Sequence, residues 1–177
     1  MLKPNKEYWR NIYEGEFQAG RDRQEYVLNV LSKRFPEKKF PDLEIKETGF
    51  GAETAKRIKL RKHERGEPDK TVYYKGEVIC YMEVSGADIE MAPDKDIWIR
   101  PDKFDHAKQK EEETWFYMVY KSGDFLLNRE VIEPYTDQVK TVYLKGPDIP
   151  ERYISIPSIK AHSREKFFDW LEKQVTE

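Results

Sequence analysis

The chain has 177 residues, of which 38% are hydrophobic and 14% aromatic, so it is long enough to bury a core and is expected to form one domain over residues 1–177. Charged residues make up 37% of the chain and nearly cancel at a net charge of −2, which neither requires nor excludes a nucleic-acid partner. The single cysteine, Cys80, excludes an internal disulfide and a cysteine-rich zinc site. No run is apolar enough to span a membrane and the first residues do not form a signal peptide, so a cytoplasmic location without membrane contact is expected.

Two helices are predicted at the start of the chain. Apolar residues recur at helical spacing over residues 4–17, and Gly20 is expected to end that helix. Asp22 is suited to cap a second helix, which should end at Phe35-Pro36. A strand through Leu43 and Ile45 is predicted next.

The most basic stretch of the sequence lies directly upstream of Pro68-Asp69. Its cationic residues are Lys56, Arg57, Lys59, Arg61, Lys62 and Arg65. Such a run suits a groove that holds a phosphate backbone, where each charge adds salt-dependent affinity without reading the base sequence. The alternative is a solvated surface, which is the usual role of a charged run.

The segments at residues 71–74 and 78–84 are rich in β-branched and aromatic residues, and Lys75-Gly76 separates them. This pattern predicts a hairpin of two neighbouring strands. Asp69 enters the first strand and Glu83 lies near the end of the second. The hairpin should therefore bring these two carboxylates to one edge of a sheet.

The later elements alternate between strands and helices. The strongest strand signal is the aromatic run at residues 114–120, which fits a buried central position. The others are a strand at 97–99, a helix at 102–113, a strand or helix at 125–131, a strand pair at 139–144 and 152–156, and a final helix capped by Ser163. This order predicts an α/β or α+β protein in which helices flank a small mixed sheet.

The segment from Pro68-Asp69 to Glu83-Val84-Ser85 resembles the signature of the PD-(D/E)XK nucleases, the restriction-endonuclease-like superfamily. In that signature Pro-Asp precedes a strand, a turn and a strand that ends in acidic-x-Lys. The resemblance covers residues 20–120 and implies a three-layer α/β/α fold around a small mixed β-sheet. Ser85 occupies the position of the family's lysine.

Pro-Asp occurs five times in the chain, so the surrounding pattern has to identify the relevant copy. Pro68-Asp69 is the copy that precedes a hairpin ending in Glu-x-Ser. Pro41-Asp42 is the second choice, because Glu44 and Lys46 follow it and supply an acidic-x-Lys sequence. No turn separates Asp42 from Glu44, which disfavours this copy.

The resemblance implies hydrolysis of phosphodiester bonds in DNA with the help of Mg²⁺ or Mn²⁺. The implied metal ligands are the carboxylates of Asp69 and Glu83 and the backbone carbonyl of Val84. In the superfamily a helix glutamate often reaches the active site, and Glu25 is the residue that resembles it. The alternative for Glu25 is a solvent-facing helix position.

The missing lysine is the main departure from the family pattern. Ser85 donates a hydrogen bond but supplies no positive charge. In some members of the superfamily a basic residue from a neighbouring element takes over, and Lys103 and Lys108 on the predicted following helix are the candidates here.

DNA is the expected partner, and the resemblance leaves a homodimer open because many such enzymes pair to cut two strands. Two other interpretations also stay open. Ser85 is consistent with an inactive nuclease-like module that binds nucleic acid or a protein. Alternatively, the chain is a structural or interaction protein in which Asp69 and Glu83 are ordinary turn and edge-strand acids.

Overall fold

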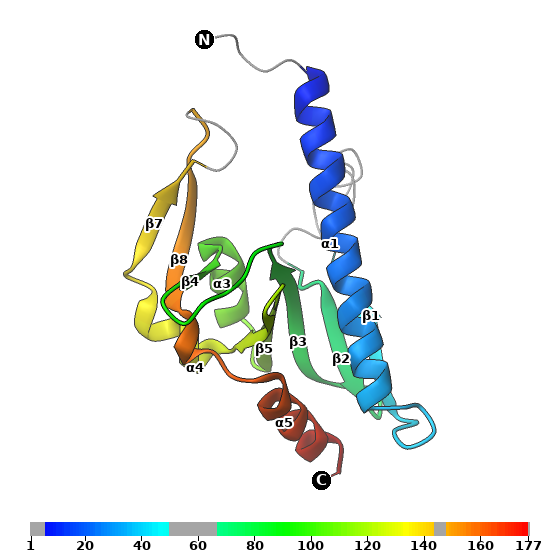
Figure 1. Ribbon diagram of the computed structural model, residues 1–177. Coiled ribbons are helices and arrows are strands. Elements are labelled where there is room, and N and C mark those ends of the chain that lie inside the picture. The colour runs from blue at the N-terminus through cyan, green and yellow to red at the C-terminus, as the bar shows by residue number, and fades with distance from the viewer. Residues whose placement is uncertain (1–5, 50–66, 144–147, 177) are drawn as a thin grey trace.

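A computed structural model describes residues 6–49, 67–143 and 148–176 of the chain, with side chains from residue 18 onward (Figure 1). The elements are α1 (Lys6–Arg34), β1 (Leu43–Glu47), β2 (Lys70–Tyr74), β3 (Glu77–Gly86), β4 (Asp96–Ile99), α3 (Pro101–Lys108), β5 (Glu113–Tyr120), β6 (Gly123–Leu127), α4 (Arg129–Ile132), β7 (Val139–Val142), β8 (Glu151–Pro157) and α5 (Arg164–Thr176). Short 3-10 turns lie at Glu133–Tyr135 and Ser158–Lys160.

The main sheet has the strand order β1-β2-β3-β5-β6. Strands β3 and β5 are parallel, and the other neighbours are antiparallel. β5 lies between β3 and β6 and is buried along most of its length, as its aromatic sequence predicts. The predicted α/β class with a mixed sheet flanked by helices is confirmed.

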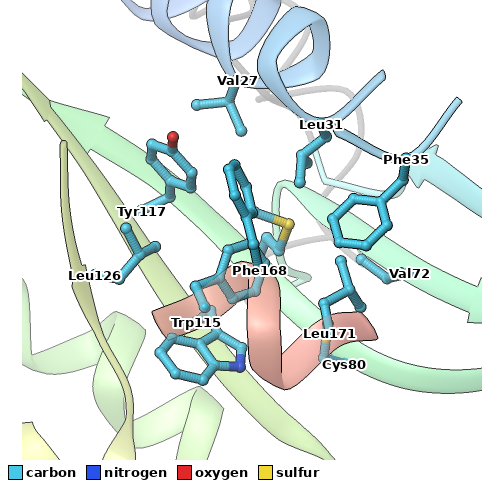
Figure 2. Packing of buried hydrophobic residues seen from close by; sticks show 12 residues of the cluster. Val27, Leu31, Phe35, Val72, Cys80, Trp115, Tyr117, Leu126, Phe168 and Leu171 are labelled. Carbon is cyan, nitrogen blue, oxygen red and sulfur yellow. The ribbon is translucent and has the colours of Figure 1, made fainter. Parts of the chain in front are cut away.

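Helices α1 and α5 cover one face of the main sheet (Figure 2). Val27 and Leu31 of α1 meet Phe168 of α5 and Trp115 of β5 in this core. Because side chains alternate along a strand, the even-numbered residues of β2 and β3, such as Val72, point to this same face. The odd-numbered positions, which include Asp69 and Glu83, point to the opposite face of the sheet.

Helix α3 and a second sheet cover that opposite face. The second sheet has the order β4-β8-β7, and its Ile97 and Ile154 pack with Phe104 of α3 and Phe116 of β5. The sequence predicted these strands but not that they form a sheet of their own. The reason is that alternating apolar residues indicate a strand but do not show which other strand it pairs with.

The prediction of two helices at the start of the chain is wrong, since α1 continues through Gly20. A glycine inside a helix costs about 1 kcal/mol relative to alanine, which packing of the rest of the helix offsets. The Gln18 amide also donates to the Asp22 carboxylate, 2.8 Å away, across this turn. Asp22 therefore lies within α1 and does not cap a second helix. In the described parts of the chain, no helix is long and apolar enough to cross a membrane.

Other boundaries follow from local capping. α3 ends at Lys108, earlier than predicted, and the run at 125–131 divides into the end of β6 and the start of α4. The Asn128 side chain accepts a hydrogen bond from the Val131 amide at 3.3 Å, which begins α4. Ser163 accepts one from the Lys166 amide at 3.2 Å, so the predicted cap of α5 is confirmed.

Gly86, at the end of β3, is required by a close approach of two strands. Its φ is 137°, and an added Cβ would lie 1.9 Å from the carbonyl oxygen of Val119 in β5. Gly123 has a similar φ of 143°, but a Cβ there would meet nothing within 4 Å. An alanine at Gly123 would suffer only backbone strain, whereas an alanine at Gly86 would suffer the same strain and a steric clash.

We expect Gly86→Ala to lower the free energy of unfolding by at least about 2 kcal/mol more than Gly123→Ala, because overpacking adds to the shared strain. Urea unfolding of both variants measures the difference. Equal losses would show that β3 and β5 do not approach this closely at Gly86.

Candidate active site

The hairpin of β2 and β3 forms as predicted. Lys75 and Gly76 adopt φ values of 52° and 81°, which suits a tight two-residue turn. Lys70 of β2 pairs with Met82 of β3, so the preceding Asp69 lies beside the following Glu83. The two carboxylates are buried, with 7% and 6% of their residue surfaces exposed.

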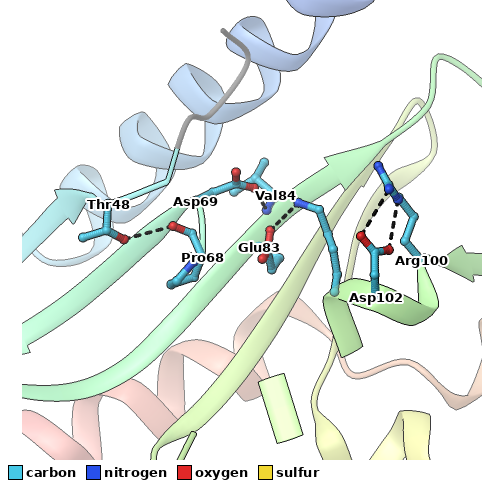
Figure 3. A network of polar contacts seen from close by, with 8 residues as sticks. Thr48, Pro68, Asp69, Glu83, Val84, Arg100 and Asp102 are labelled. Carbon is cyan, nitrogen blue, oxygen red and sulfur yellow. Dashed lines mark hydrogen bonds and ion pairs between the residues drawn. The ribbon is translucent and has the colours of Figure 1, made fainter. Parts of the chain in front are cut away.

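Asp69 is fixed by its surroundings (Figure 3). Its carboxylate Oδ2 accepts a hydrogen bond from the backbone N–H of Val84 at 2.9 Å, and its carbonyl accepts one from the N–H of Thr48 at 3.2 Å. The Thr48 hydroxyl donates to the carbonyl of Pro68 at 2.9 Å and lies 2.8 Å from the Thr71 hydroxyl. The end of β1 therefore holds Pro68-Asp69 in place.

Lys103 reaches the carboxylates from α3. Its ammonium nitrogen lies 2.6 Å from Oε2 of Glu83 (Figure 3). α3 is anchored by Phe104, which is 1% exposed, and begins at Pro101, a favourable first position of a helix. Arg100 and Asp102 form an ion pair of 3.2 Å beside it. The helix therefore delivers a positive charge to the side of the sheet that holds Asp69 and Glu83.

Burial changes the protonation of this cluster. The pKa of Glu83 rises to about 8, because burial penalises its charged form, although Lys103 opposes the shift and Asp69 adds to it. Burial alone would lower the pKa of Lys103, but the carboxylates of Asp69 and Glu83 outweigh it and raise that pKa. Lys103 therefore keeps its charge at neutral pH, and it offsets the negative charge that Glu83 acquires when it ionises.

The other predicted site residues are placed differently. Ser85 is exposed and shares the sheet face of Glu83, two residues along β3. The Lys108 ammonium instead lies 3.4 Å from Asp105 and 5.2 Å from the centre of the Phe104 ring, on another side of α3. Glu25 is exposed on α1.

The predicted basic run and the competing Pro41-Asp42 motif lie in other segments of the chain. The basic residues Lys56, Arg57, Lys59, Arg61, Lys62 and Arg65 lie outside the described residues. The competing acidic-x-Lys sequence lies in β1, at the edge of the sheet, where Lys46 and Glu44 pair with each other at 3.0 Å and are both exposed.

A buried polar pair that the sequence did not indicate lies on the α1 side of the sheet. Lys70, 1% exposed, donates to the side-chain carbonyl of Gln24 at 3.0 Å. Gln24 of α1, and not its neighbour Glu25, thus faces the sheet. Strand alternation from Asp69 puts Lys70 on the α1 side, but the partner in α1 depends on the rotation of that helix, which periodicity does not fix within one residue.

The donor set at Asp69 and Glu83 fits a hard cation. Mg²⁺ is commonly held by one or two carboxylates together with waters and substrate phosphates, and it does not need a larger protein cage. Among the described residues there is no cluster of three or more histidine, cysteine or acidic side chains, so this pair is smaller than a complete protein cage. Both carboxylates are buried, and because a ligating carboxylate must be ionised, a metal that binds Glu83 would displace the proton that burial keeps there.

Comparison with known proteins gives the fold. The chain matches no family model and no curated protein sequence. A nuclease from a fusellovirus is similar in structure, with a TM-score of 0.54 and 15% identity over 97% of this chain and 95% of that one. The Holliday junction resolvase Hjc of the archaeon Archaeoglobus fulgidus gives a TM-score of 0.45 and 9% identity over 85% of this chain and 96% of that one. The chain therefore shares its fold with this viral nuclease, and that fold has the mixed sheet flanked by helices that the sequence resemblance implies.

The raised pKa of Glu83 makes the stability of the metal-free protein depend on pH. The ordinary value is 4.5 and the folded value is about 8, so between these values the folded chain holds a proton that the unfolded chain has released. The stabilising contribution is therefore complete below pH 4.5 and is lost as the pH rises to about 8.

We expect Glu83→Gln to remove this decline, which is at most about 1.4 kcal/mol per pH unit, because glutamine mimics the neutral acid. Urea unfolding between pH 5 and pH 9 in a chelator measures it. Glu77→Gln, an exposed position at the start of the same strand, is the control and should keep the wild-type slope. Parallel curves for Glu83→Gln and the wild type would contradict the raised pKa.

Proposed function

We propose that this protein is a metal-dependent nuclease that hydrolyses phosphodiester bonds in DNA. The observation that carries the proposal is the ion pair of 2.6 Å between Lys103 and Glu83, beside a buried Asp69. It supplies two carboxylates and a cation on one face of a sheet of the nuclease fold, although Ser85 stands at the usual position of the lysine.

Asp69 and Glu83, with the backbone carbonyl of Val84, would hold Mg²⁺ or Mn²⁺. The bound metal would polarise the scissile phosphate and lower the pKa of a water molecule. The chain's own contribution is to fix the ligands: the Val84 N–H orients the Asp69 carboxylate, and burial keeps competing water away from Glu83. Fixed ligands need little reorganisation during the reaction.

Lys103 takes the role of the missing lysine in this proposal. It stays protonated at neutral pH and its side chain is 37% exposed, so it can reach a substrate as well as Glu83. Its ammonium can donate to a phosphate oxygen or to the attacking water, offsetting the negative charge that develops there. Ser85, on the same face, adds a neutral donor.

DNA is proposed as the substrate on two grounds. One is the nuclease fold, and the other is the basic run that includes Lys56, Arg57 and Arg65, which precedes Asp69 in the chain. A run of this kind binds a phosphate backbone through salt-dependent contacts. Glu25 remains a proposed helper that orders water at the metal, although its exposed position favours the solvent-facing alternative.

We expect Lys103→Met to slow DNA cleavage by at least about 100-fold, the usual effect of removing one positioned group that stabilises the transition state. Lys108→Met, on the same helix but turned away, is the matched control and should stay within about 2-fold of the wild type, as surface substitutions do. Cleavage of labelled duplex, branched and single-stranded DNA in Mg²⁺ or Mn²⁺ measures both. Equal rates for the two variants would remove Lys103 from the mechanism.

A second candidate is an inactive module that binds nucleic acid. The same contact favours it, because a metal at Glu83 would have to displace both the Lys103 ammonium and the proton of Glu83. Under this candidate, DNA binding weakens with salt but no cleavage occurs in any metal.

Metal binding separates both candidates from a purely structural protein. We expect saturating Mn²⁺ to raise the unfolding temperature of the wild type, since a ligand at about 100 times its Kd stabilises by about 2.7 kcal/mol. Asp69→Asn, which keeps a hydrogen-bond acceptor for Val84 but loses the charge, should lose most of the shift. Glu44→Gln at the competing motif should keep it. A wild type that Mn²⁺ does not stabilise would contradict the metal site.

A further inference from the structure

A pocket of about 680 Å³ opens beside the candidate active site. Ser85 and Gly86 at the end of β3 form part of its wall, and Met118 and Tyr120 of β5 lie on the same sheet face. Ser85 follows Glu83 by two residues, which is about 7 Å along a strand. An occupant of the pocket would therefore adjoin whatever the carboxylates bind.

The lining of the pocket also includes an aromatic pair from the second sheet. Trp98 of β4 and Tyr153 of β8 stack with their ring centres 5.6 Å apart and their planes 25° apart. Trp98 is 36% exposed, and Ile89 at the pocket is 45% exposed. The pocket therefore offers apolar and aromatic surface that an occupant could cover.

The charges at the pocket do not favour a phosphate group. Among the described residues that line it, Asp94 and Asp96 balance Lys95 and Lys140. Lys140 also lies 3.3 Å from Asp96, which partly neutralises it. A polyanion is held by an excess of cations, whereas a nucleobase is neutral, flat and able to stack on an aromatic ring.

We propose that this pocket receives an unpaired base of the DNA substrate, next to the phosphate that is cut. The base stacks on the pair of Trp98 and Tyr153, and the carboxylates of the pocket can accept hydrogen bonds from its amino groups. Inside a duplex every base is paired and stacked, so such a pocket selects DNA with a single-stranded stretch, flap or branch near the cut. This inference rests on the proposed function, because it names the substrate class of that same site.

The test uses the full chain and a short single-stranded oligonucleotide that carries one fluorescent aminopurine, with a chelator present to prevent cleavage. Stacking on an aromatic side chain quenches aminopurine. We expect quenching by the wild type and an affinity about 10-fold lower for Trp98→Ala, within the range measured for loss of one base stack. Trp98→Phe, which keeps a stacking face, should restore most of both.

Tyr143→Ala removes an exposed aromatic residue that does not line the pocket and should match the wild type. Thermal unfolding of each variant separates misfolding from loss of the contact. Equal affinity and quenching for Trp98→Ala and the wild type would overturn the inference, and so would failure of the wild type to bind the oligonucleotide.

Cleavage assays in Mg²⁺ on a flapped and a fully paired duplex separate this inference from the proposed function. If cleavage depends on Asp69 but Trp98→Ala does not change the preference for the flap, the base-binding role of the pocket is wrong and the nuclease activity stands. If quenching depends on Trp98 but no DNA is cleaved, the pocket binds a base and the proposed nuclease activity is wrong.

Discussion

The site depends on the burial of two carboxylates at neighbouring strand positions. Asp69 and Glu83 lie side by side almost without contact with solvent, which is unfavourable for two negative charges unless a cation is near. Lys103 partly meets this need in the protein alone. A metal and a phosphate would meet it differently, because a bound metal would displace the proton that burial keeps on Glu83.

The rest of the fold positions this pair. α1 and α5 pack on one face of the main sheet, which leaves the other face to α3 and the second sheet. That second face presents Glu83, Lys103 and the wall of the pocket together. In Figure 1, α1 and the β7–β8 hairpin extend past the end of the main sheet on opposite sides of it, at the end where β3 terminates.

Much of this arrangement could be predicted from local sequence signals. The Lys75-Gly76 turn and its flanking apolar runs fix the hairpin, and the hairpin alone puts Asp69 beside Glu83. The choice between Lys103 and Lys108 could not be made that way. The two are five residues apart, about 140° around a helix, and the way α3 packs on the main sheet decides which one reaches Glu83. The second sheet and the Gln24–Lys70 contact likewise depend on tertiary packing that no short pattern encodes.

Locating the metal directly would test the central claim, that Asp69 and Glu83 form a metal site served by Lys103. A crystal grown with Mn²⁺ allows this through the anomalous scattering of the ion. The account predicts a peak at about 2.1 Å from carboxylate oxygens of both Asp69 and Glu83, with the Lys103 ammonium displaced from its present contact of 2.6 Å with Glu83. Saturating Mn²⁺ with no peak there, and with the Lys103–Glu83 pair unchanged, would contradict it.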